Sequence, residues 1–225
     1  MTQAYELSKK ERCKAWLTRY RDTLRYALHV IVRPFDGFWD LSREKRGSLA
    51  AANTIVFLTL LTRILTLQYT SFQFITVHWE YVNIFSESLA ILLPLLIYVC
   101  ANWCFTTLFE GKGTLKDIYI GMGYCLTPYV LIGLPLILLS NMVTLKEGAF
   151  YGVFSSLSLI WCGYLFVVAM MEIHDYSLGK TLVFTVMSIF GMLIIVFLML
   201  LFFSLLSDAV SYFVAFYKET AFRMY

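Results

Sequence analysis

The chain has 225 residues, of which 60% are hydrophobic and 15% are charged, and its formal net charge is +3. Soluble globular domains are closer to half apolar and a quarter charged, so this composition indicates an integral membrane protein and excludes most classes of soluble enzyme. The positive charge is unevenly distributed, because residues 1–46 hold 11 of the 18 Lys and Arg residues. Basic segments that flank membrane spans stay in the cytoplasm, which predicts a cytoplasmic N-terminus.

Residues 1–47 form a basic head that we expect to contain an amphipathic helix over residues 14–32. Leu17, Leu24 and Ile31 recur at helical spacing on one side of this segment, and basic side chains occupy the other. Such a helix either lies on the anionic inner leaflet of the lipid bilayer or packs its apolar face on the protein's own spans. Both interpretations are compatible with the sequence, and neither gives a reason to expect a nucleic-acid partner.

Pro34 is expected to end that helix, because proline lacks an amide N–H and disfavours helical geometry in the residue before it. The segment that follows brings Phe35, Phe38 and Trp39 close to the start of the first apolar stretch. Aromatic side chains collect at membrane–water interfaces. These three residues therefore either fix the depth of the first span or form a docking surface for another protein.

Five long apolar stretches follow the head, separated by short polar loops. Each holds the roughly twenty apolar residues with which a helix crosses about 30 Å of hydrocarbon. The predicted fold class is all-α: an integral membrane bundle of five transmembrane helices, residues 48–206, preceded by the cytoplasmic amphipathic helix. Alternating crossings of the cell membrane leave residues 207–225 as a short extracytoplasmic tail. The five stretches are residues 48–69, 86–109, 118–140, 149–173 and 181–206.

Two polar loops are predicted on the cytoplasmic side, beside the head. The loop after the second stretch contains Gly111 and Gly113, which we expect to end a helix in left-handed geometry. Thr114 and Asp117 follow at the spacing of a capping box for the next helix. The loop after the fourth stretch repeats this design loosely. With the aromatic segment, these loops provide the candidate partner-docking residues: Phe35, Phe38, Trp39, Glu110, Lys112, Lys116, His174, Asp175 and Lys180.

Polar groups inside the apolar stretches are the other functional candidates, because they are costly in hydrocarbon. Arg63 is the one unambiguous mid-span charge in the sequence. It either snorkels to the outer headgroups or pairs with Glu80 or Glu87, or else it serves a ligand or a partner subunit. Asn102 is expected to hydrogen-bond across helices, and Pro128 is expected to kink the third span.

Catalytic chemistry finds little support in the sequence. There is no zinc-ligand spacing, no His-Glu-x-x-His motif and no pair of mid-span aspartates. We therefore expect no enzymatic activity, no cofactor and no metal site.

Three short motifs, taken in order, carry a resemblance to a known family. Pro-Phe-Asp-Gly-Phe-Trp-Asp-Leu occupies residues 34–41, Phe-Glu-Gly-Lys-Gly-Thr-Leu-Lys residues 109–116 and Gly-Met-Gly-Tyr-Cys-Leu-Thr-Pro residues 121–128. The ordered set resembles the Yip family over about residues 33–206, and this implies five membrane helices with a cytoplasmic N-terminus. The chain more nearly resembles the bacterial branch, some of whose members are encoded beside sugar ABC importers. The interaction of eukaryotic members with Rab GTPases is not carried over, because bacteria lack that trafficking system.

These observations favour a non-enzymatic scaffold or accessory subunit that docks a membrane transport complex. Its expected partners are the lipid bilayer and other membrane-protein subunits, with the permeases of a sugar ABC transporter as the specific candidate. The alternative is a transporter or channel in its own right, formed by an oligomer.

Overall fold

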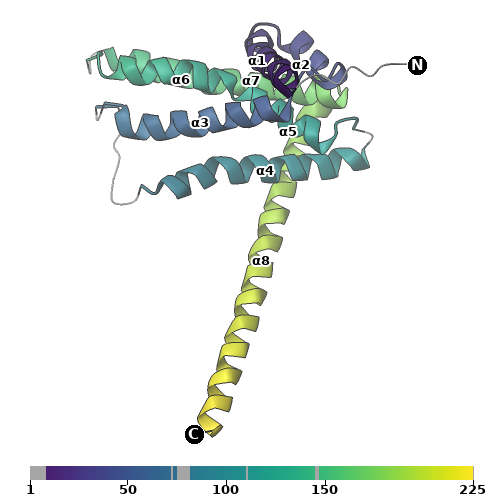
Figure 1. Ribbon diagram of the computed structural model, residues 1–225, viewed down its shortest axis with the longest axis vertical. Coiled ribbons are helices and arrows are strands. Elements are labelled where there is room, and N and C mark those ends of the chain that lie inside the picture. The colour runs from purple at the N-terminus through teal and green to yellow at the C-terminus, as the bar shows by residue number, and fades with distance from the viewer. Residues whose placement is uncertain (1–8, 72, 75–81, 110, 145–146, 225) are drawn as a thin grey trace.

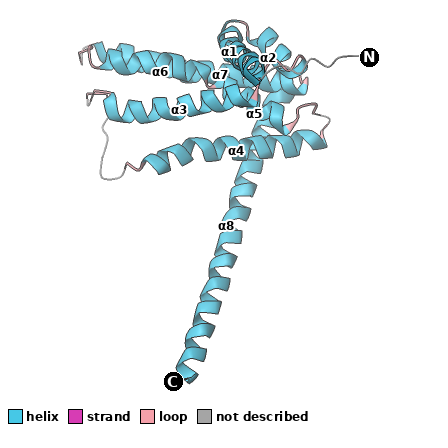
Figure 2. Cartoon of the chain, viewed as in Figure 1, coloured by secondary structure: helices cyan, strands magenta, loops and turns pink. Residues whose placement is uncertain are grey.

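The computed structural model describes residues 9–71, 73–74, 82–109, 111–144 and 147–224. Its helices are α1 (Lys9–Val32), α2 (Pro34–Arg43), α3 (Leu49–Tyr69), α4 (Ile84–Leu108), α5 (Leu115–Cys125), α6 (Thr127–Ser140), α7 (Gly148–His174) and α8 (Leu178–Met224). Short loops connect them, and the described residues contain no strand (Figure 2). Five segments are long and apolar enough to cross a membrane: α3, α4, α5 continued by α6, α7 and α8. The all-α fold and the five predicted spans are confirmed.

The helices that cross a membrane run side by side except for the last one. Figure 1 shows α3, α4 and the neighbouring α6 and α7 aligned with one another, while α1 and α2 cover one end of this group. The same end holds the loop between α4 and α5 and the loop between α7 and α8. α8 begins there, crosses α4 and extends away from all the other helices (Figure 1).

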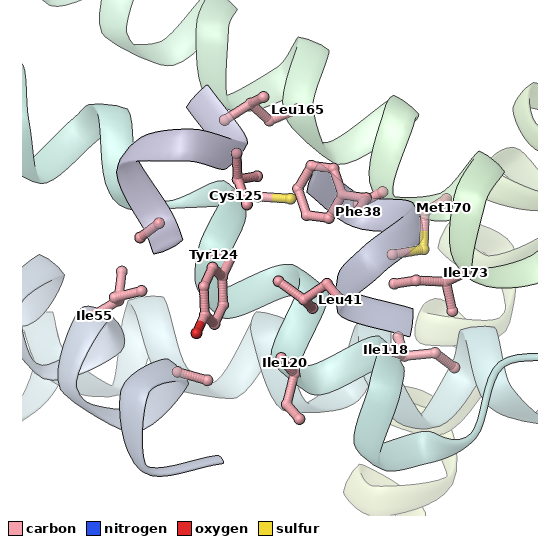
Figure 3. Close-up of a cluster of buried hydrophobic side chains, with 14 of the residues drawn as sticks. Phe38, Leu41, Ile55, Ile118, Ile120, Tyr124, Cys125, Leu165, Met170 and Ile173 are labelled. Carbon is pink, nitrogen blue, oxygen red and sulfur yellow. The ribbon is translucent and has the colours of Figure 1, made fainter. Parts of the chain in front are cut away.

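The buried core lies at the covered end, where α2 inserts between α5 and α7. Phe38 is fully buried there and lies among Ile118, Met170 and Ile173 (Figure 3). Burial of a phenylalanine side chain contributes about 1.5 to 3 kcal/mol. The sequence pattern did not predict α2 as a helix, although Pro34 occupies its first turn, where proline's missing N–H costs nothing.

α1 packs on the protein rather than standing free of it. Ala27 and Val30 are buried against the neighbouring helices, whereas Leu17 and Leu28 are more than half exposed. The Tyr124 hydroxyl of α5 also donates a hydrogen bond to a backbone carbonyl of α1 at 2.9 Å. Packing on the protein's own helices is therefore what the structure favours for the central part of α1, and the apolar stripe read from the sequence is buried only in part.

The third span is broken as its prolines predict. α5 ends at Cys125 and α6 begins at Thr127, and Pro128 lies in the first turn of α6. Proline fits that position because the first amide groups of a helix have no helical partner. The expected kink is therefore confirmed as a change of helix at Leu126.

α8 is 47 residues long, which at the usual helical rise is about 70 Å, more than twice the thickness of the hydrocarbon layer. It does not end at Leu206, and the segment predicted as a tail continues the same helix as far as Met224. Every residue from 196 to 220 is exposed. Only the beginning of α8 is therefore held by the rest of the chain.

Candidate functional site

The end of the molecule that carries α2 brings together the segments that the sequence proposed for docking. We call this region the docking face: α2, residues 111–117 and residues 174–180. Its centre is Asp175, whose carboxylate accepts a hydrogen bond from Lys112 at 2.6 Å and pairs with Arg43 at 3.1 Å. α2 and the two loops, distant in the sequence, thus share one carboxylate. Glu110, also proposed for docking, lies outside the described residues.

The backbone conformation of Asp175 orients its side chain toward Lys112 and Arg43. Asp175 ends α7 in a left-handed conformation with φ of 60°, which aspartate tolerates better than most residues. The hydrogen bond from Lys112, and then the charges of Lys112 and Arg43, lower the pKa of the Asp175 carboxyl below its usual range. The carboxylate is therefore ionised throughout the physiological pH range.

A second ion pair fastens the link between α2 and α3 to α5. Lys45 has a left-handed backbone with φ of 54°, and its ammonium group lies 2.9 and 3.0 Å from the two carboxylate oxygens of Asp117. Thr114 accepts the backbone N–H of Asp117 at 3.3 Å and donates its hydroxyl to the carboxylate at 2.7 Å. The predicted cap at Thr114 is confirmed. Asp117, the acidic residue of this cap, is also the residue that binds Lys45.

The three aromatic residues of α2 do not share one surface. Phe35 and Trp39 are 46% and 48% exposed, but Phe38 is completely buried. Adjacent residues of a helix point about 100° apart, which separates Trp39 from Phe38, whereas Phe35 lies one turn before Phe38 on the same side and is nonetheless half exposed. Phe38 is therefore removed from the docking candidates, and it holds α2 in place instead.

His174 is also a core residue rather than a surface group. It is 2% exposed, and its Nε2 lies 2.9 Å from Oδ1 of Asn102. Asn102 donates from Nδ2 to Ser188 of α8 at 3.1 Å and to Tyr98 at 3.2 Å. The predicted cross-helix bond of Asn102 is confirmed, and this polar cluster joins α4, α7 and α8 beneath the docking face.

Gly113 allows the loop between α4 and α5 to approach this cluster. A Cβ atom at Gly113 would lie 2.5 Å from a methyl carbon of Ile173 and 2.8 Å from Cε1 of His174. The left-handed conformation expected at Gly111 and Gly113 is wrong, because no described glycine has a positive φ. The two glycines are used here for close packing, since a Cβ at Gly111 would meet the side chain and backbone of Thr106 at 2.6 and 2.9 Å.

The remaining docking candidates are exposed. Lys116 lines a cavity of about 410 Å³ together with Trp16 and Arg19 of α1. Lys180 places its ammonium group 4.1 Å from the centre of the Tyr176 ring, at cation–π distance. Phe35, Trp39, Lys116 and Lys180 are thus side chains that a partner can reach, and Lys112 and Asp175 are also exposed, at 61% and 54% of the side chain, although they are paired with each other.

Arg63 lies at the opposite end of the spans. Its Nε donates to Glu87 of α4 at 3.0 Å, which agrees with one of the pairings predicted from the sequence; Glu80 lies outside the described residues. The pair lines a cavity of about 560 Å³ between α3, α4, α6 and α7, together with Tyr129 and Tyr151. Among the described residues, no group of three or more His, Cys, Asp or Glu side chains is placed to hold a metal ion.

Comparison with known proteins gives one finding. A family model described as Yip1 domain matches residues 28–201, from within α1 to within α8. No curated protein and no solved structure matches the chain. The matched range contains α2, both loops of the docking face and the Arg63–Glu87 pair.

Proposed function

The chain belongs to the Yip family, and from that premise we propose that it is a non-enzymatic scaffold or accessory subunit of a membrane transport complex. The proposed partner is an ABC-type importer, because some members of the bacterial branch that the sequence resembles are encoded beside sugar ABC importers. The docking face is the surface that we propose for the contact. Its exposed aromatic and basic side chains are the groups that would meet a permease or ATPase subunit.

The observation that carries this proposal is the fixed geometry of the docking face. Asp175 joins α2 to both loops, through Arg43 at 3.1 Å and Lys112 at 2.6 Å. A surface that is ordered before binding loses little conformational entropy when a partner docks. The docking face therefore has the rigidity that a scaffold needs.

The chemistry of the exposed groups also fits docking. Trp39 and Phe35 are about half exposed on α2, and tryptophan is among the residues that dominate binding energy at protein interfaces. Lys116 and Lys180 lie in the first turns of α5 and α8, at the same end of the molecule, and charge on such a rim sets orientation and association rate more than affinity. An acidic rim around an apolar pocket is the complementary surface that we expect on the partner.

The orientation that we propose places this face in the cytoplasm of a cell whose outer boundary is the cell membrane, with the C-terminus on the opposite side. The basic head supports it, because 11 of the 18 Lys and Arg residues lie in residues 1–46. In a variant Lys112→Cys, an impermeant thiol reagent should label inside-out vesicles and leave intact cells unlabelled. Labelling of intact cells would reverse the orientation.

The docking proposal is tested by co-purification from native membranes in mild detergent. The variant Trp39→Ala should lose most of the importer subunits that accompany the unchanged protein, and Phe35→Ala should weaken their retention further. Trp161→Ala is the matched control, since Trp161 is 38% exposed on α7 and away from the docking face. If the unchanged protein purifies without importer subunits and its deletion leaves solute uptake unaltered, the proposal is wrong.

A second candidate function, transport by an oligomer of this chain, is favoured by the cavity beside Arg63 and Glu87. Charged groups at membrane depth mark solute pathways in many transporters. Purified chain in liposomes should then move solute without any other protein, and Arg63→Gln should abolish that movement. The scaffold proposal expects no movement by the chain alone.

A further inference from the structure

The cavity beside Arg63 has the size and composition of a ligand site. Its volume of about 560 Å³ falls within the range of about 300 to 1,000 Å³ typical of small-molecule sites. One wall carries the Arg63–Glu87 ion pair, and Tyr129, Tyr151 and Ser155 supply hydroxyl groups to the same space. Four membrane-crossing segments contribute to it, so it belongs to the helix group and not to one loop.

The ion pair remains reachable from the cavity. The side chains of Arg63 and Glu87 are 39% and 30% exposed, and Nε of Arg63 is the atom that donates to Glu87. A guanidinium group has five N–H donors and a carboxylate has about four acceptor positions. Arg63 also has a hydrogen bond with Tyr129, and these two contacts still leave donors on the guanidinium group and acceptor positions on the carboxylate for a ligand.

The two charges lie toward the same end of the spans. Arg63 precedes the end of α3 at Tyr69 by six residues, and Glu87 follows the start of α4 at Ile84 by three. These helix ends lie on the same side of the spans (Figure 1). At the usual rise, the α-carbon of Arg63 is about 9 Å and that of Glu87 about 4.5 Å from the respective helix end. Both residues are thus attached within about two helical turns of that end, and their charged atoms meet at one level, 3.0 Å apart.

Apolar side chains flank the pair on the side where α3 and α4 diverge. A smaller cavity of about 170 Å³ lies on the other side of Glu87, lined by Ile64, Leu67 and Ile84. Leu126 and Leu159 form the deeper part of the larger cavity. A ligand here must therefore be charged at the level of the pair and apolar below it.

We infer that this site binds a zwitterionic phospholipid with a primary amine, of the phosphoethanolamine type. Such a headgroup carries a phosphate and an ammonium group a few bonds apart, which is the charge complement of the neighbouring Arg63 and Glu87. The phosphate accepts hydrogen bonds from the guanidinium group, and the ammonium donates to the carboxylate. An anionic headgroup without an amine meets repulsion from Glu87, and a quaternary amine has no N–H to donate. This inference is independent of the docking face.

The test uses the purified, delipidated full chain in detergent and native mass spectrometry. Phospholipids with identical acyl chains and ethanolamine, choline or glycerol headgroups are titrated separately, and soluble phosphoethanolamine is the fourth probe. The ethanolamine lipid should bind at least about tenfold more tightly than the other two lipids, which is what one charge-assisted hydrogen bond contributes. Equal binding of all three lipids overturns the inference, and so does soluble phosphoethanolamine binding as tightly as the lipid.

Two variants separate recognition from folding. Arg63→Gln keeps a polar side chain but removes the guanidinium group that would hold the phosphate, so binding of the ethanolamine lipid should weaken at least about tenfold. Glu87→Gln keeps the shape of the side chain and should erase the preference for ethanolamine over choline. Lys112→Gln, on the docking face, is the control and should bind the lipid unchanged. Retained preference for ethanolamine in Glu87→Gln, or unchanged binding in Arg63→Gln, contradicts the inference.

Discussion

Replacement of Asn102 by leucine tests whether the buried polar cluster holds α8 to the other helices. Asn102 is 2% exposed and its side chain contacts Tyr98, Ser188 and His174 at 3.2, 3.1 and 2.9 Å. The change Asn102→Leu keeps most of the volume but removes every one of these hydrogen bonds. α4 would then lose its hydrogen bond to His174 of α7 and the one from Asn102 to Ser188 of α8.

The expected cost follows from two contributions. Hydrogen bonds between membrane helices average about 0.6 kcal/mol each, and Asn102 makes two, to α7 and to α8. The variant also strands Nε2 of His174, whose Nδ1 already has no hydrogen-bond partner among the described residues; an unsatisfied buried polar group costs about 1 to 3 kcal/mol. The free energy of unfolding should therefore fall by roughly 2 to 4 kcal/mol.

The assay is equilibrium unfolding of the full chain in mixed micelles with increasing sodium dodecyl sulfate. Thr107→Ala is the control on the same helix, because Thr107 is exposed and its hydroxyl bonds only to a carbonyl of its own helix; it should change stability by less than about 0.5 kcal/mol. A double-mutant cycle with Ser188→Ala isolates the contact to α8. If Asn102→Leu costs no more than Thr107→Ala, the cluster does not contribute to stability and the reasoning fails.

Three further outcomes follow from the docking face. Phe38→Ala should destabilise the chain by about 3 to 5 kcal/mol because it empties a fully buried site, whereas Trp39→Ala should alter thermal unfolding little; equal effects would mean that α2 is not inserted in the core. Gly113→Ala should lower the melting temperature, since its Cβ would lie 2.5 Å from Ile173, and an unchanged value would show that the loop yields freely. The pKa of Asp175 is lowered mainly by Lys112, so the contribution of this carboxylate to stability is present above the ordinary aspartate pKa near 4 and is lost as the pH falls below that value. Calorimetry should therefore show a smaller loss of stability between about pH 5 and 3 in Lys112→Gln than in the unchanged protein. An identical pH dependence of the two proteins would exclude this contact as the cause.

Much of the fold is predictable from the sequence because a membrane imposes strong length and polarity requirements. The spans follow from runs of apolar residues, the breaks at Arg33 and Leu126 follow from the neighbouring prolines, and Thr114 follows from cap spacing. α8 continues past Leu206, where the last span was predicted to end, because Asp208 is compatible with an exposed helix. None of the residues that follow it interrupts a helix. Local signals thus place helices well and helix ends less well.

The site was less predictable, because its contacts join residues far apart in the chain. Asn102 and His174 are 72 residues apart, and no periodicity within either helix shows that they meet. Phe38 and Trp39 look alike in the sequence, and only the insertion of α2 between α5 and α7 distinguishes them. Gly113 illustrates the same difficulty, since its role depends on Ile173 and His174 rather than on its own backbone geometry.

Because α8 is so long, a small change of angle where it is attached moves its far end by a large distance. Its last contact in the polar cluster is Ser188, and 36 residues separate that residue from the helix end at Met224, a distance of about 54 Å. A tilt of about 10° at Ser188 displaces the far end by roughly 9 Å over that length. α8 leaves the other helices shortly after this cluster, where Gly191 still packs against Phe105 of α4, so a small change of angle at this end produces a large displacement at the distant tip.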